Sequence, residues 1–293
     1  GQIRAPKLST KGSYAAYLKD DALYLVDTKG GTPEWVAKGE QDYCWYDDTS
    51  LLYSSQDYEA FDGIHRIHGN TRQSETYGDP KFMYADLTTD HQGRIFARKS
   101  QVVHGDEGTK VPPYGIISMS MESGEEETLI EAISYEDERY QLGASYAPQI
   151  EGISKDSRYL YIWDRTASGS MSADGMRVGI YDLKERIYMR MVEGSLVTGP
   201  ITPEEPWDQY ILQNSANLSA SPLNPLLLAA NLGAGREMTH DKQLGLLDFE
   251  EGTESILTDS EQAAETVRFS LDGKSVYYAS GQALTRSRRP KRS

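Results

Sequence analysis

The sequence predicts an all-β protein made of repeated antiparallel sheets. Short apolar and aromatic runs such as Leu23–Val26 and Val276–Tyr278 recur along the chain, and such runs are typical of strands. Tight turns rich in Gly, Asp, Asn and Ser separate them, and long helical patterns are nearly absent. The clearest copy is Phe269–Ser280, in which Asp272-Gly273 joins two strands into a hairpin.

Weaker copies of this hairpin set the repeat length. Their turns fall near residues 12, 49, 93, 157, 224 and 273. Six units of about 49 residues each match four-stranded propeller blades. We therefore predict a six-bladed β-propeller of four-stranded antiparallel blades, as a single domain over residues 1–285 followed by a basic tail at 286–293. The predicted blades span approximately 1–41, 42–80, 81–131, 146–192, 208–258 and 263–285.

The last predicted blade lacks an obvious outer strand. Propellers usually close by letting one chain end complete the blade of the other end. Ile3-Arg4-Ala5 is the candidate for this strand, which would leave Lys7-Leu8 to begin blade one. The alternative is Arg286–Ser293, which its charge makes a poorer strand.

Composition narrows the classes of partner. A net charge of −15 argues against nucleic acid, because phosphate binding needs a basic surface. No apolar run approaches the roughly 18 residues of a membrane helix, so we expect no transmembrane segment. Five cations crowd the last eight residues without an acid: Arg286, Arg288, Arg289, Lys291 and Arg292. This tail has two interpretations, contact with an anionic surface or acidic partner, and a solvated chain end.

Cys44 is the only cysteine, which excludes an internal disulfide and a cysteine-based zinc site. It precedes Trp45 and Tyr46 in an apolar strand, so we expect a buried, unreactive thiol. The sequence begins Gly1-Gln2 without methionine or an apolar signal segment, and we interpret it as a chain from which a leader was removed.

Three patterns together resemble a known family. Ser-x-x-Gly stands before an apolar-aromatic strand, "LYLVDTKGG" covers Leu23–Gly31, and "VGIYDL" covers Val178–Leu183. These resemble the six-bladed TolB-like propellers over nearly the whole chain, and they are also similar to the propeller domain of prolyl-oligopeptidase-type enzymes. Blade two departs from the pattern because its turn has no glycine, and blade five has Asn224-Pro225 there. The resemblance implies an extracytoplasmic protein, whether periplasmic, secreted or surface-anchored.

The long connections predict which side of the blades carries function. In a four-stranded blade, the turns between its first and second strands and between its third and fourth strands lie on one side, and here they are short. The connections between second and third strands lie on the other side, and four of them are long: Ser54–Gly63, Lys99–Pro113, Arg165–Arg177 and Asn231–Gln243. Long loops on a rigid scaffold are where binding usually occurs.

We therefore expect non-catalytic binding of a protein or another macromolecule through this long-loop side, without a cofactor. The candidate binding residues are Tyr58, Phe61, His104, Asp106, Glu107, Tyr135, Tyr140, Arg165, Arg236 and His240. The alternative is an enzyme, a metal-dependent lyase or hydrolase on the same side, since some TolB-like propellers resemble metal-dependent sugar lyases.

In that alternative His104, Asp106 and His240 would bind the metal if their loops converge. His65 and His68 are unsuitable, because residues three apart on a strand point to opposite faces. A serine hydrolase is excluded in this stretch of sequence, which contains no Gly-x-Ser-x-Gly.

Overall fold

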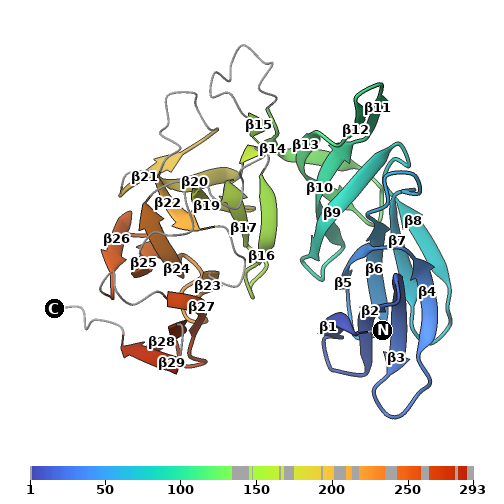
Figure 1. Cartoon of the computed structure of the whole chain (residues 1–293), viewed down its shortest axis with the longest axis horizontal. Coiled ribbons are helices and arrows are strands. Elements are labelled where there is room, and N and C mark those ends of the chain that lie inside the picture. The colour runs from blue at the N-terminus through green and yellow to red at the C-terminus, as the bar shows by residue number, and fades with distance from the viewer. Residues whose placement is uncertain are drawn as a thin grey trace. The chain divides into compact units, whose positions relative to one another are not determined.

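The structure is a computed structural model of the whole chain. It describes residues 2–133, 145–146, 148–164, 166–167, 175–192, 194–200, 209–212, 218–234, 243–258, 264–280 and 283–288. Every regular element within these ranges is a strand, which confirms the predicted all-β class (Figure 1). The chain divides into two compact units, residues 1–132 with 148–150, and residues 133–147 with 151–293. The single propeller domain over residues 1–285 stays a prediction.

The first unit contains three antiparallel sheets of four strands each, with their strands in chain order. The first sheet is β1 (Arg4–Leu8), β2 (Tyr14–Lys19), β3 (Ala22–Asp27) and β4 (Glu34–Lys38). The second is β5 (Gln41–Trp45), β6 (Ser50–Ser55), β7 (Ile64–His68) and β8 (Ser74–Tyr77). The third is β9 (Phe82–Thr89), β10 (Arg94–Gln101), β13 (Pro113–Ser120) and β14 (Glu126–Glu131). Four-stranded antiparallel sheets of this kind are the units from which propellers are built.

The N-terminal strand belongs to the first sheet. In β1, Arg4 lies opposite Leu18 and Leu8 lies opposite Ala15 of β2. The prediction that Ile3-Arg4-Ala5 completes the last blade is therefore wrong, because Arg4 and Ala5 already form the first strand of the first sheet. Trp45 of the second sheet also holds β1 in place, because its indole N–H donates to the carbonyl of Lys7 in β1 over 3.0 Å.

Three of the six turns that define the sequence repeat share one hydrogen-bond pattern. The N–H of Ser9 donates to the carbonyl of Tyr14 over 2.9 Å, and the Ser9 hydroxyl accepts from the N–H of Tyr14 over 3.0 Å. The same two bonds join Ser154 to Tyr159 and Ser270 to Ser275. In these three turns the serine hydroxyl accepts a backbone N–H that would otherwise lack an acceptor, which explains why serine recurs at this position in the sequence.

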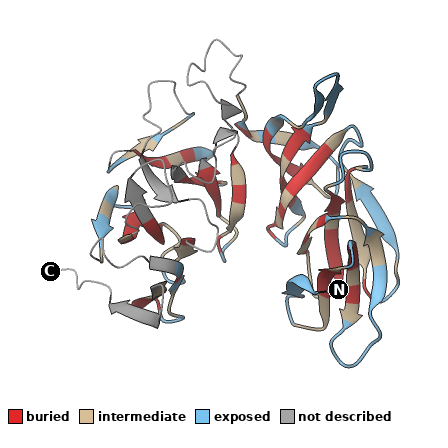
Figure 2. Cartoon of the chain, viewed as in Figure 1, coloured by how far each residue is buried: buried red, intermediate tan, exposed pale blue. Residues whose placement is uncertain are grey.

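The core of the first unit lies between successive sheets (Figure 2). Side chains alternate between the two faces of a strand. Accordingly Leu51 packs with Leu23 and Leu25 of the first sheet. Its neighbour Leu52 packs with Ile95 and Ile117 of the third sheet. Both faces of β6 are therefore buried, so the second sheet is held between the other two.

The second unit holds the remaining strands, except that Gln149 and Ile150 at the start of one of them group with the first unit. Its short strands are β15 (Ser145–Tyr146), β18 (Thr166–Ala167), β21 (Ser195–Thr198), β22 (Gln209–Leu212) and β23 (Leu218–Ala220). The longer strands of its large sheet are β16 (Gln149–Ile153), β17 (Tyr159–Asp164), β19 (Gly175–Asp182), β20 (Ile187–Val192), β24 (Leu227–Ala234), β25 (Gln243–Asp248) and β26 (Thr253–Ile256). A separate sheet contains β27 (Ala264–Phe269), β28 (Ser275–Ser280) and β29 (Ala283–Arg288).

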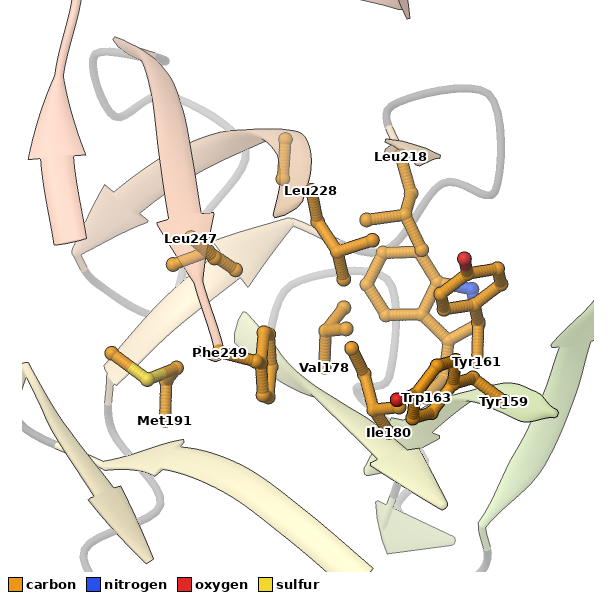
Figure 3. Packing of buried hydrophobic residues seen from close by; sticks show 11 residues of the cluster. Tyr159, Tyr161, Trp163, Val178, Ile180, Met191, Leu218, Leu228, Leu247 and Phe249 are labelled. Carbon is orange, nitrogen blue, oxygen red and sulfur yellow. The ribbon is translucent and has the colours of Figure 1, made fainter. Parts of the chain in front are cut away.

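The strands predicted as blades four and five are joined in one sheet of ten strands. The long strands β19 and β24 extend past their hairpin partners, and β22 pairs with both extensions. Buried side chains of the two halves pack into one cluster, in which Tyr161 and Val178 lie near Leu228 and Phe249 (Figure 3). This continuity differs from the separate blades that the sequence suggested.

The last sheet shows three strands among the described residues. Its third strand, β29, includes Arg286 and Arg288, so the predicted basic tail begins inside a strand. Residues 289–293 lie outside the described residues.

Candidate functional site

The short turns of the first unit join neighbouring sheets. Asp48, in the turn between β5 and β6, accepts hydrogen bonds from the hydroxyls of Ser13 (2.5 Å) and Ser9 (2.7 Å) in the first sheet's turn. The N–H of Lys11 also donates to Asp48 over 2.8 Å. The hydrogen bond from the Ser13 hydroxyl has the largest effect and that from Ser9 the next largest, and together they hold the pKa of Asp48 well below its ordinary value. These polar groups are occupied in structural contacts.

The opposite ends of the same sheets carry the long connections. Residues 56–63 link β6 to β7, and residues 102–112 link β10 to β13. We call these two segments together the loop surface. The second segment was expected to be an irregular loop, but it forms a hairpin of β11 (Val103–Gly105) and β12 (Gly108–Lys110). Asp106-Glu107 forms the turn, and Gly108 at the start of β12 has a φ of 107°, a conformation that favours glycine.

Side-chain contacts connect the two segments of the loop surface. Glu59 Oε1 lies 3.6 Å from Nδ1 of His104, and the same nitrogen is 3.0 Å from the hydroxyl of Thr109 across the hairpin. Asp62 binds Nε2 of His65 over 2.6 Å, which ties the first segment back to β7. Of the four long connections predicted from sequence, the two at residues 56–63 and 102–112 therefore form one surface.

A buried lysine supports the base of the hairpin. Lys99, near the end of β10, is 9% exposed, and its ammonium donates to Oε1 of Glu126 over 2.6 Å. The ammonium also lies over the rings of Phe82 (4.0 Å) and Tyr114 (5.4 Å). The two rings contact each other edge to face at 5.2 Å. A desolvated ammonium is stabilised by such aromatic faces and by a carboxylate, so this cluster fixes the strands from which the hairpin projects.

The loop surface combines exposed rings with negative charge. Tyr58 is 47% exposed, Val103 is 42% exposed, and Tyr114 beside the hairpin is 52% exposed. The two segments contain five carboxylates and one lysine, a net charge of −4 with histidine neutral. These groups are Asp57, Glu59, Asp62, Asp106, Glu107 and Lys110. Exposed aromatic side chains among charges are typical of protein-binding surfaces.

The chemistry available for metal binding is limited. No group of three His, Cys, Asp or Glu side chains in the described part of the chain is arranged to hold a metal ion. His65 bonds to Asp62 and Thr76, whereas Nδ1 of His68 lies 3.2 Å from the hydroxyl of Ser50. The two histidines therefore have separate partners, in agreement with the sequence argument.

Half of the predicted site residues can be placed. Tyr58, Phe61, His104, Asp106 and Glu107 all lie on the loop surface. The other five lie outside the described residues: Tyr135, Tyr140, Arg165, Arg236 and His240. The grouping of His104 and Asp106 with His240 in a metal site stays a prediction for the same reason.

Sequence reasoning missed three residues of this region. Glu59 was passed over because an acid in a polar loop carries no signal, and only the contact with His104 gives it a role. Tyr114 stands at the start of the apolar strand β13, where sequence gives no sign that its ring is exposed. Lys99 was treated as the edge of a loop. Its position inside an apolar strand, beside Phe96 and Ala97, was an available signal for a buried charge that needs a partner.

Comparison with known proteins gives similar structures but no family. No protein-family model and no curated protein matches the chain. TolB from Acinetobacter baumannii is similar at 14% identity and a TM-score of 0.44, covering 98% of this chain and 60% of that one. An oligogalacturonate lyase in complex with manganese is similar at 11% identity and a TM-score of 0.41, covering 99% and 90%. A structure assigned to TolB from Agrobacterium tumefaciens has 15% identity and a TM-score of 0.43, covering 88% and 81%.

The chain is thus similar to TolB structures, as the sequence resemblance predicted, and it spans 60% of the length of the Acinetobacter protein. The described residues contain no helix long and apolar enough to cross a membrane.

Proposed function

We propose that the chain is a six-bladed propeller that binds a protein or another macromolecule through its long-loop side. The observation that carries this proposal is the loop surface of the first unit. There a contact between Glu59 and His104 joins two long connections, and exposed Tyr58 and Val103 lie in the same segments. On the other side, Asp48 and the Ser9–Ser13 turn are already occupied in a contact between sheets.

Two further parts of the proposal rest on the sequence. The number of blades follows from the six turn positions, and the location outside the cytoplasm follows from the resemblance to TolB-like propellers. Binding without a cofactor is favoured because the residues of the loop surface present rings and carboxylates to solvent. Such a surface suits contact with a large partner.

The experiment compares two matched charge reversals at opposite ends of one strand. Asp106→Lys/Glu107→Lys changes the tip of the hairpin that precedes β13. Glu122→Lys/Glu125→Lys changes two exposed acids in the turn that follows β13. Each variant and the unchanged chain is used as bait for a cell-envelope extract, and captured proteins are identified by mass spectrometry.

We expect one set of partners to be captured by the unchanged chain and by the Glu122/Glu125 variant, and to be lost from the Asp106/Glu107 variant. Capture that is unaffected by the hairpin reversal, or lost only in the turn variant, would contradict the proposal. Metal content is measured on the same preparations. A bound divalent metal that disappears in both His104→Ala and His240→Ala would favour the lyase or hydrolase alternative.

A further inference from the structure

The hairpin β11–β12 offers unpaired strand edges. In the described part of the chain each of its strands pairs only with the other. All six of its residues are exposed, as Figure 2 shows for this projecting ribbon. An unpaired edge presents a row of N–H and C=O groups that can accept another strand. A two-stranded ribbon gains stability when a further strand joins it.

The two edges differ in how well they are protected. Natural sheets protect an edge with lysine, proline or a bulge. β12 ends with Lys110, whose ammonium lies 3.3 Å from Glu107. Both strands are also short, which itself protects an edge, but β11 reads Val103-His104-Gly105 and contains no lysine, proline or bulge. The edge of β11 is therefore the one open to strand addition.

Charge and exposed apolar area select the kind of strand that would fit. The loop surface carries a net charge of −4, and Glu59 lies 3.6 Å from His104 of β11 itself. No described residue bonds the carboxylate of Asp106 at the hairpin tip. An incoming strand that carries positive charges would be attracted to this surface, and its apolar side chains would cover Val103 and Tyr58.

We propose that the edge of β11 binds an extended segment of a partner protein in which Lys or Arg alternates with apolar residues. The inference rests on the proposed function, because it names the partner of the same surface. Backbone hydrogen bonds to β11 supply the affinity, since strand addition depends on the main chain. The carboxylates of the loop surface select for basic side chains.

The test measures binding of labelled synthetic peptides to the full chain by fluorescence anisotropy. The probe is a nine-residue peptide of alternating lysine and valine. Two matched peptides accompany it. In one, every lysine is replaced by glutamate, and in the other, alternate backbone nitrogens are methylated so that charge and side chains are kept but strand pairing is blocked.

We expect the Lys/Val peptide to bind, and both matched peptides to bind at least about tenfold more weakly. Asp106→Lys/Glu107→Lys should weaken Lys/Val binding by about the same factor, while Glu122→Lys/Glu125→Lys should leave it unchanged. Equal binding of the methylated peptide, or of the glutamate peptide, would overturn the proposal. Absence of Lys/Val binding would also overturn the proposal. Self-association of the chain that Asp106→Lys/Glu107→Lys abolishes would overturn it as well, because the strand bound at β11 would then come from a second copy of this chain.

The strand-addition inference and the proposed function can fail separately. If peptides do not bind but envelope partners are still lost on the hairpin reversal, the binding surface stands and the strand-addition inference fails. If envelope partners are captured regardless of the hairpin, the proposed function fails as well.

Discussion

Replacing Lys99 by methionine removes the ammonium that lies between Glu126 and the rings of Phe82 and Tyr114. Methionine keeps an apolar stem of similar length against those rings, so the change isolates the charge. Breaking a fully buried ion pair by removing one partner costs about 3–5 kcal/mol, and an exposed pair contributes under about 1 kcal/mol. The Lys99 side chain is 11% exposed and that of Glu126 is 25% exposed. We therefore expect Lys99→Met to lower the free energy of unfolding by about 2 kcal/mol.

The pairwise part is measured with a double-mutant cycle. Glu126→Gln alone leaves a buried ammonium and should cost a similar amount, about 2 kcal/mol. In the double variant neither charge remains unpaired, so the total loss should fall short of the sum by about 1–2 kcal/mol. Urea unfolding of the four proteins, followed by tryptophan fluorescence, gives these free energies if the m-values agree.

Lys110 and Glu107 provide the matched control. Their charges lie 3.3 Å apart, but their side chains are 68% and 85% exposed. The same cycle with Lys110→Met and Glu107→Gln should give a coupling below about 0.5 kcal/mol. If the Lys99 and Glu126 changes are additive within about 0.4 kcal/mol, the ion pair does not hold the base of the hairpin, and the reasoning about this cluster is refuted.

Three other predictions concern single residues. Asp48→Asn should lower the urea midpoint at neutral pH. The folded-state pKa of Asp48 is depressed, so its contribution to stability is complete above an unfolded-state pKa of about 3.9 and is lost progressively as the pH falls from there through the folded-state pKa. A midpoint difference that does not begin to shrink between about pH 5 and pH 3 would contradict the assignment. Gly179→Ala would place a methyl group against the buried ring of Tyr188, and it should lower the free energy of unfolding in urea by about 1–3 kcal/mol. Gly152 faces open space, so the control variant Gly152→Ala should change this free energy by less than about 0.5 kcal/mol. Desolvation, with a smaller contribution from Asp42, raises the pKa of Cys44 to about 12. An aromatic disulfide reagent at about pH 8 should therefore react with this one thiol only after unfolding. Rapid reaction of the folded chain would show that the Cys44 thiol is accessible and would contradict the prediction.

The strands of the first unit could be predicted because their chemistry is local. The apolar run at Leu51-Leu52 and the turn residues before it identify β6 directly, and the serine turn at Ser9 has its own hydrogen-bond pattern within six residues. Such features depend on neighbours in the chain, so one sequence is enough to find them. The position of Cys44 between Tyr43 and Trp45 indicated a buried thiol, but in the structure the residue is only partly buried.

The remaining features depend on contacts that are distant in sequence. Arg4 was assigned to the wrong sheet because the choice between two edges is made by Trp45 and Lys7, 38 residues apart. The hairpin β11–β12 is polar and rich in glycine, so it lacks the apolar alternation by which strands are recognised. For the candidate site, the sequence identified both segments, and the five predicted residues that lie within the described part of the chain all belong to them. The contact of Glu59 with His104, which makes the two segments one surface, required the fold.

The binding surface itself is tested most directly by hydrogen–deuterium exchange of the full chain with and without a partner captured from the envelope extract. Exchange is read for peptides that cover residues 56–63 and 102–112, and for peptides that cover the turns at Ser9–Ser13 and Asp47–Ser50. The account predicts that the partner slows exchange in the two long segments, most strongly in Val103–Gly105, and leaves the turns unchanged. Slowed exchange in the turns with no change in residues 102–112 would contradict it.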